Sequence, residues 1–443
     1  MLDPAPAEPP GVILVLGGGI AGLAAADRLS RAGWRVRVIE RAPLAGGMHQ
    51  AYTIGGYTFD AGSIFYEENA ALFDLAPGLR DMCPSVSRRQ RRIAPDGSVR
   101  HYPFEPRELR GQSALALVRM VIDLLWSRLA VPRDGTLDAI ARKRLGRRLF
   151  EQTGLAAYIT RFHHVSPREI DETFFFHRMA FVARASRLRN LISFLLRTRT
   201  RPRPSLRVRP HEGFAPLFNS IVKRLAAQGV AFRFGEELLS LQREGRLFLV
   251  RTTSGICRVE AVVSTIPLDS LHRALFGTSS GLVSLDMTTL FLSAASLDSR
   301  LGNVLYNFHG SGEWKRATIY SRIYATPQTD REFLAVETTI PPGGHHDPQR
   351  AFEAFRAHMD SLGLASDLRL EGNVRVKNCY PLYPHGSSGT IARVIERISR
   401  TGIVLAGRQG RFEYLPTSSG VIRRVVEELD AAALPAFQSS PAT

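Results

Sequence analysis

Three consecutive glycines, residues 17–19, stand between an apolar run and an alanine-rich stretch that contains no proline. Residues 12–16 have the composition of a strand that is buried on both faces. Residues 20–32 predict a helix, which Gly33 closes. Residues 35–39 predict a second strand. Strand, helix and strand in this order predict a βαβ unit in a parallel sheet, so we expect a fold of the α/β class.

The glycines match a dinucleotide-binding fingerprint, G-x-G-x-x-G, at Gly17, Gly19 and Gly22. Gly17 permits the tight turn, Gly19 lets the main chain approach a pyrophosphate, and Gly22 lets the helix pack on the strand. The helix N-terminus adds free N–H groups and a partial positive charge. Glu40 follows the second strand, where a carboxylate accepts hydrogen bonds from ribose hydroxyls. An ordinary glycine-rich turn is the alternative, and the strand, helix and acid in register disfavour it.

The composition limits the class of protein. The chain has 443 residues, enough for two or three domains, and 44% of them are hydrophobic, as in folded soluble proteins. A net charge of +17 favours anionic partners without choosing among them. Three widely spaced cysteines suit a reducing compartment, so we expect a cytoplasmic protein, and no metal-ligand spacing stands out. Residues 114–131 carry three charged side chains and predict an amphipathic helix rather than a membrane span.

The sequence after Glu40 indicates which dinucleotide is bound. A second glycine pair, Gly46 and Gly47, is followed by the stretch YTIGGYTFDAG, which predicts a hairpin. This order resembles the flavoprotein superfamily of amine oxidases, protoporphyrinogen oxidases and UDP-galactopyranose mutases. The resemblance implies non-covalent FAD in a Rossmann-like domain of the glutathione-reductase type.

The resemblance continues in two later segments. Residues 212–267 are similar to the family's middle FAD-binding segment, in which a backbone group near Leu238 lies over the adenine. The stretch GIVLAGRQGRFEYLPTSSG leads to a helix that Thr417 or Ser418 caps, with its N-terminus toward the flavin. Arg408 is expected to pair with the pyrophosphate. The FAD-binding residues implied by fingerprint and resemblance are Gly17, Gly19, Ile20, Ala21, Gly22, Glu40, Arg41, Gly46, Gly47, Met48, Gly62, Ser63, Leu238, Gly407, Arg408, Ser418 and Ser419.

These segments divide the chain into two expected domains. Residues 1–75, 205–275 and 386–443 form the FAD-binding domain. Residues 76–204 and 276–385 interrupt it as a substrate domain, of which the first part is helical and basic. The second part alternates like an antiparallel sheet, so the substrate domain mixes helices with such a sheet.

The candidate catalytic residues come from the resemblance to the mutase branch. Arg322 and Tyr414 match an arginine and a tyrosine that reach the substrate phosphates there, against the alternatives of a surface strand residue and a core aromatic. Ser63 and Tyr66 stand where the mutases carry two histidines, which makes Tyr66 the third candidate. Pro416 replaces a mutase aspartate, and these departures disfavour strict mutase chemistry. The aromatic pair of the amine oxidases is not evident either.

Residues 184–209 hold nine arginines and no acid. They are expected to contact a nucleotide-linked or carrier-linked substrate or, peripherally, a membrane surface, unless they are only a solvated basic face. No nucleic-acid motif accompanies the charge, so nucleic acid is not an expected partner.

The sequence therefore predicts an FAD-dependent oxidoreductase. It would oxidise or desaturate a small anionic or carrier-linked metabolite by hydride transfer to flavin N5. One alternative is a redox-neutral, UDP-galactopyranose mutase-like sugar-nucleotide enzyme that uses reduced flavin. A second alternative is a flavin-binding protein without turnover. The oligomeric state stays open.

Overall fold

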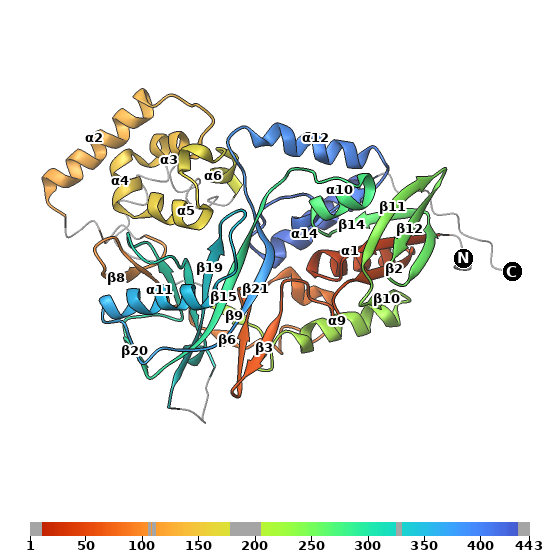
Figure 1. The fold of residues 1–443 in the computed structure, drawn as a ribbon, viewed down its shortest axis with the longest axis horizontal. Helices are drawn as coiled ribbons and strands as arrows, with labels where there is room; N and C mark the ends of the chain where they lie inside the picture. Colours follow the sequence, from red (N-terminus) through yellow and green to blue (C-terminus); the bar gives the residue numbers. More distant parts are fainter. Residues whose placement is uncertain (1–10, 105–107, 109–111, 178–204, 325–329, 433–443) are drawn as a thin grey trace.

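The computed structural model describes residues 11–104, 108, 112–177, 205–324 and 330–432. Figure 1 shows a parallel sheet with its helices on one side of the molecule, and a large, mostly antiparallel sheet with a group of helices on the other. The α/β fold class predicted from the sequence is confirmed.

The parallel sheet has the strand order β10-β2-β1-β14-β22. Its strands are β1 (Val12–Leu16), β2 (Arg35–Glu40), β10 (Ala231–Phe234), β14 (Ala261–Ser264) and β22 (Val404–Leu405). The central strand β1 is buried throughout, because alternate side chains enter two cores. Ile13 and Val15 pack with α1 (Ile20–Arg31), whereas Leu14 packs on the antiparallel sheet of β11 (Leu238–Glu244), β12 (Leu247–Thr252) and β13 (Gly255–Val259).

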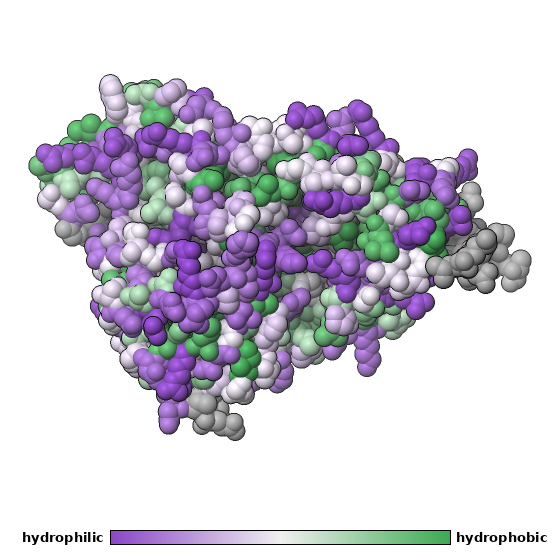
Figure 2. All heavy atoms as spheres, viewed as in Figure 1, coloured by the Kyte–Doolittle hydropathy of each residue, from purple (hydrophilic) through white to green (hydrophobic). Residues whose placement is uncertain are grey.

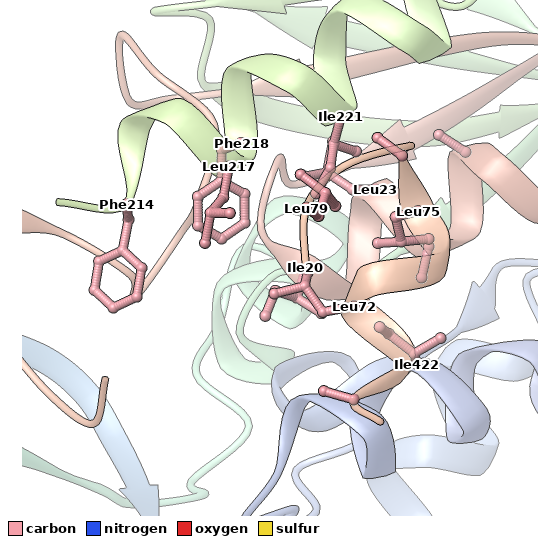
Figure 3. Packing of buried hydrophobic residues seen from close by; sticks show 14 of the residues in the cluster. Ile20, Leu23, Leu72, Leu75, Leu79, Phe214, Leu217, Phe218, Ile221 and Ile422 are labelled. Carbon is pink, nitrogen blue, oxygen red and sulfur yellow. The ribbon is translucent and has the colours of Figure 1, made fainter. Parts of the chain in front are cut away.

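Helix α1 lies at the centre of a core shared by distant parts of the chain. The other elements of this core include α9 (Ala215–Ala227), the 3-10 helix η1 (Ala71–Leu75) and α14 (Ser418–Ala431). Figure 3 shows side chains from these elements, such as Leu72 and Ile422, gathered around Ile20 and Leu23 of α1. Burial of this core therefore joins the first, middle and last segments of the predicted FAD domain.

A seven-stranded sheet has the order β21-β15-β19-β18-β17-β7-β8. Its strands are β7 (Gln90–Ile93), β8 (Val99–His101), β15 (Ser284–Ala294), β17 (Val304–Asn307), β18 (Arg316–Ile319), β19 (Glu332–Ile340) and β21 (Arg369–Pro381). One face packs Leu290 and Val336 on α11 (Pro348–Ser361). On the other face the Thr289 hydroxyl donates to the Ala61 carbonyl oxygen at 2.9 Å. That face therefore meets the loop that follows the predicted hairpin.

The helices α2 (Ala114–Ala130), α3 (Leu137–Leu145), α4 (Arg147–Gln152), α5 (Leu155–His163) and α6 (Thr173–His177) form a separate group. Helix α2 packs on α3 and α4 at the edge of the molecule (Figure 1). Within the described residues, no helix is both long and apolar enough to cross a membrane.

The remaining elements connect these parts. They are β3 (Ala51–Ile54), β4 (Tyr57–Asp60), β5 (Phe65–Glu67), β6 (Ser85–Val86), β9 (Leu206–Val208), β16 (Ser296–Leu297), β20 (Ala365–Ser366), α10 (Leu268–Phe276), α12 (Ser387–Ser399), α13 (Gly407–Gly410), η3 (Pro167–Glu169) and η4 (Tyr320–Arg322).

The predicted elements are found with small shifts in their ends. All strands of the parallel sheet come from the three segments predicted for the FAD domain, and all strands of the seven-stranded sheet come from the two inserts. Within the second insert, the alternating stretch around Arg322 is not one continuous strand. β18 ends at Ile319 and the chain turns into η4, where the N–H of Ile323 donates to the carbonyl of Tyr320. Most of the arginine-rich segment lies outside the described residues.

Candidate functional site

Two of the fingerprint glycines are required by the geometry of the protein itself. Gly17 has φ +102°, a conformation that favours glycine, and a Cβ there would lie 2.7 Å from Thr265 Oγ1. A Cβ on Gly22 would lie 1.7 Å from the carbonyl oxygen of Gly17. The first turn of α1 therefore packs directly on the loop that leaves β1.

At Gly19, neither a positive φ nor a close contact with protein requires a glycine. Its φ is −76°, which any residue adopts, and a Cβ there would make an ordinary contact, 3.6 Å from Gly47 Cα. The N–H groups of Ile20, Ala21 and Gly22 have no acceptor in the described structure, because α1 has no side-chain cap. Bare main chain beside free N–H donors fits a pyrophosphate. The residues present therefore fit a bound dinucleotide.

The second glycine pair lies against this loop. The N–H of Gly46 donates to the carbonyl of Gly18 at 3.0 Å, and Gly46 forms a parallel bridge with Gly19. Gly47 has φ +60°, and a Cβ there would lie 3.1 Å from Gly19 Cα. The fold thus brings the two glycine motifs together, as the resemblance implied.

Met48 and His49 follow the second glycine pair and carry no charge at neutral pH. Met48 Sδ accepts a weak hydrogen bond from Gln409 Nε2 at 3.6 Å. The His49 ring lies 5.0 Å from the Phe214 ring and 5.5 Å from the Phe218 ring. Burial lowers the pKa of His49 to about 4. The imidazole is therefore neutral at pH 7.

Glu40 stands at the end of β2, where the adenosine half of a dinucleotide is expected. One carboxylate oxygen accepts from the N–H of Gly18 at 2.7 Å and the other from the N–H of Ala42 at 2.8 Å. Each oxygen keeps further acceptor capacity for a ribose diol. The middle segment reaches the same place, since the N–H of Glu236 donates to the Glu40 carbonyl at 3.0 Å and β11 begins at Leu238.

The C-terminal segment closes the other side of α1. Gly407 has φ +71°, and a Cβ there would lie 2.6 Å from Ala21 Cβ. Helix α14, which follows, packs along α1. Glycine at this position therefore lets the last segment approach the start of α1.

The N-terminus of helix α14 follows this segment. Thr417 caps it, accepting from the N–H of Gly420 at 3.1 Å, as the sequence predicts for either Thr417 or Ser418. The Ser419 hydroxyl donates to Glu67 at 2.7 Å. The N–H groups of Ser418 and Ser419 have no acceptor in the described structure. These two residues therefore offer main-chain donors to a ligand, and the Ser419 side chain binds protein.

The loop after β4 is held by a buried ion pair. Arg209 Nη2 lies 2.7 Å from Asp60 Oδ2, and the two side chains are 1% and 0% exposed. Arg209 also donates to the carbonyls of Thr58, Pro210 and His211. Burial raises the pKa of Asp60 to about 6, while the charge of Arg209 opposes the rise.

Three predicted FAD residues near these elements have little contact with protein. Arg41 and Ser63 are exposed. A Cβ on Gly62 would meet nothing within 4 Å. A cofactor can therefore contact these three residues without a clash with protein. Their roles in FAD binding stay predictions.

Arg408, Tyr414 and Tyr380 form a cluster that sequence reasoning did not find. The Arg408 guanidinium lies 4.9 Å from the centre of the Tyr414 ring and 5.3 Å from that of Tyr380, and the two rings are 5.9 Å apart. Arg408 also donates to the Cys379 carbonyl. Arg408 Nε is buried and has no hydrogen-bond partner among the described residues, so the protein does not use all the donors of this guanidinium.

Lys315 and Glu337 support this cluster from the seven-stranded sheet. Lys315 Nζ donates to the Tyr380 hydroxyl at 2.5 Å and lies 2.8 Å from Glu337 Oε2. Burial opposes ionisation of Glu337, yet the charges of Arg316 and Lys315 lower its pKa below the usual value. A buried chain of carboxylate, ammonium and phenol therefore fixes the position of Tyr380.

Tyr66 does not join Tyr414. Its side chain is 4% exposed in the core around α1, with its ring 5.8 Å from that of Phe73. Burial raises the pKa of Tyr66 well above its usual value. A phenol in this position stays protonated and is no general base at neutral pH.

Arg322 also lies apart from Tyr414, and all three of its guanidinium nitrogens bind protein. Nε donates to Glu332 at 2.9 Å, Nη1 donates to the carbonyl of Leu301, and Nη2 donates to those of Leu297 and Asp298. These contacts fasten the chain between β16 and β17. They give no support to the predicted contact with a substrate phosphate.

A βαβ fingerprint, a glycine pair packed on it and a C-terminal helix packed along α1 define a dinucleotide-binding flavoprotein. The chain belongs to the flavin containing amine oxidoreductase family, whose model matches residues 20–293, and its cofactor is FAD. The FAD amine oxidase superfamily indicated by the sequence is thereby confirmed.

Two curated relatives match short parts of the chain. A 1-hydroxycarotenoid 3,4-desaturase of Flavobacterium sp. is 51% identical over 49 residues, or 11% of this chain. A phytoene desaturase (neurosporene-forming) of Cereibacter sphaeroides is 44% identical over 62 residues, or 14% of this chain. The chain thus spans only 10% and 12% of the length of these relatives.

Solved structures match over nearly the whole chain. A reduced UDP-galactopyranose mutase has a TM-score of 0.76 at 16% identity, and the match covers 95% of both chains. A likeness at this identity shows the shared fold.

Proposed function

We propose that the protein is an FAD-dependent dehydrogenase that oxidises or desaturates a carbon skeleton bound beside Tyr380 and Tyr414. The observation that carries this proposal is the packing of α14 along α1 in the same direction, which puts the free N–H groups of both helix N-termini at the same end of the helix pair. The family of flavin oxidoreductases and the desaturase names of the short matches support oxidation. Bound FAD supplies the acceptor for a hydride.

The residues of this chain would have separate tasks. The N–H groups of Ser418 and Ser419, with the positive end of the α14 dipole, would stabilise negative charge that develops next to them. The faces of Tyr380 and Tyr414 would orient an apolar part of the substrate and keep water away. Lys315 holds Tyr380 through its hydroxyl, which reduces the freedom of that ring.

Three basic side chains of the substrate domain bear on the choice of substrate. Lys315, Arg316 and Arg322 each pair with a carboxylate. The predicted anionic substrate and the phosphate contact predicted for Arg322 in the mutase alternative therefore gain no support from these side chains. We propose a substrate whose reacting part is apolar.

The proposal is tested by anaerobic mixing of the FAD-loaded protein with candidate donors. The candidates are polyenes in detergent micelles, amines, alcohols and sugar nucleotides. We expect at least one polyene, amine or alcohol to bleach the visible flavin band. We expect the Tyr414→Ala variant to keep its FAD and to bleach about fivefold more slowly, since an aromatic contact of about 1 kcal/mol is lost. Tyr414→Phe keeps the ring and is expected to stay near the wild-type rate.

A different result would contradict the proposal. The proposal fails if no candidate bleaches the flavin and if the dithionite-reduced protein converts a sugar nucleotide without net electron transfer. That result would select the mutase alternative.

A further inference from the structure

Helix α2 exposes an unusual amount of apolar surface. Ile122 is 60% exposed, Trp126 69% and Leu129 84%. Figure 2 shows hydrophobic residues at the edge of the molecule where α2 lies in Figure 1. The exposed large hydrophobic side chains of α2 are Leu115, Val118, Val121, Ile122, Leu125, Trp126 and Leu129. A contiguous apolar patch of this kind marks a binding surface.

The apolar side chains share one face of the helix because their spacing follows the helical repeat. The opposite face packs on α3 and α4, where Ser127 is buried. Asp123, the only acid of α2, is also turned inward, because its Oδ2 accepts from the N–H of Arg148 at 2.9 Å. Apart from Arg119, every exposed residue of α2 is apolar.

Basic side chains flank this face. On a helix of 100° per residue, Arg119 and Arg128 fall at the two edges of the apolar face. Arg119 is exposed, whereas Arg128 is partly buried and donates to the Arg144 carbonyl at 3.4 Å. Arg148, at the start of the adjoining α4, is exposed as well, and Arg147 beside it pairs with Glu151 at 3.1 Å. The outer face of α2 therefore combines an apolar strip with exposed arginines beside it, and α2 itself carries no exposed acid.

We propose that α2 lies flat in the headgroup region of a lipid bilayer that contains anionic lipids. Its 17 residues are too few to span a bilayer but suffice for a helix parallel to the surface. The apolar strip would enter the acyl boundary, with Trp126 at the interface. The flanking arginines would bind the anionic headgroups.

A second copy of the chain fits this face less well. Two α2 helices packed face to face would place the exposed Arg119 of each copy at the edge of the same seam. Since no acid is exposed on either helix, these like charges would repel without compensation. Anionic lipid supplies the missing negative charge.

The test is flotation of the full chain with vesicles of phosphatidylcholine alone and of phosphatidylcholine with phosphatidylglycerol. We expect binding to the anionic vesicles that weakens with added salt. The Leu125→Asp variant should bind about tenfold or more weakly, because it removes a leucine contact with the acyl region and adds a negative charge. Leu125 is 50% exposed in the free protein, so its replacement is expected to leave the fold intact.

Leu239→Asp is the matched control, since Leu239 is 52% exposed on β11, away from α2. It should bind vesicles within about twofold of the wild type. The proposal is overturned if the wild type does not float with anionic vesicles, or if Leu125→Asp and Leu239→Asp bind equally well. It is also overturned if the protein is a dimer that Leu125→Asp dissociates while vesicle binding stays unchanged. Sedimentation measures that last outcome.

Discussion

The Gly19→Val variant is expected to fold as the wild type does and to bind FAD at least about a hundredfold more weakly, a loss of roughly 2.7 kcal/mol. A Cβ at Gly19 meets protein only at an ordinary distance, 3.6 Å from Gly47 Cα. The added side chain instead fills the space beside the free N–H groups at the start of α1, where the pyrophosphate is expected. FAD titration of the apoprotein measures the affinity, and thermal unfolding of the apoprotein measures the fold.

Two other glycines are the controls for this experiment. Gly310 is exposed, and a Cβ there would meet nothing within 4 Å, so Gly310→Val should change neither property. Gly22→Val should disrupt folding itself, because its Cβ would lie 1.7 Å from the Gly17 carbonyl oxygen. Unchanged FAD affinity in Gly19→Val would mean that the cofactor does not lie on this loop.

The Asp60→Ala variant is expected to lose about 3–5 kcal/mol of unfolding free energy, since it leaves the buried charge of Arg209 without its counter-ion. Both side chains are almost fully buried, and Arg209 cannot turn toward water without releasing the carbonyls of Thr58 and Pro210. Urea unfolding of the apoprotein at pH 7 measures the loss.

An exposed pair is the control for the buried one. The side chains of Arg400 and Glu396 are 78% and 60% exposed, so Glu396→Ala should cost less than about 0.5 kcal/mol. The double variant Asp60→Leu with Arg209→Met should recover most of the stability, because no charge then stays buried. Equal losses in Asp60→Ala and Glu396→Ala would contradict this account of the loop after β4.

The parts of the fold that the sequence predicts depend on local order. The strand, helix and strand around Gly17 are set by periodicity and by glycines whose conformations are required within a few residues. The resemblance implied that three distant segments build one FAD site, and the structure packs Gly46 against Gly18 and Gly407 against Ala21. Periodicity alone does not place such distant segments together.

The parts that were missed depend on contacts between distant segments. Tyr380 ends a long strand and Tyr414 precedes a helix, and nothing local indicates that their rings lie 5.9 Å apart. Asp60 and Arg209 are likewise far apart in sequence. For α2, amphipathic spacing identifies an apolar face, but only the packed structure shows that α3 and α4 cover the opposite one.

The central claim is that the protein holds both the pyrophosphate and the adenosine half of FAD on main chain from three segments. The most direct measurement is a flavin-fluorescence titration of the apoprotein with FAD and, separately, with FMN, which lacks the adenosine half. The account predicts that FAD binds at least about a hundredfold more tightly. FMN has no adenosine half, so Glu40 would have no ribose to bind and the start of α1 would bind one phosphate instead of a pyrophosphate. Equal affinity for FAD and FMN would contradict it.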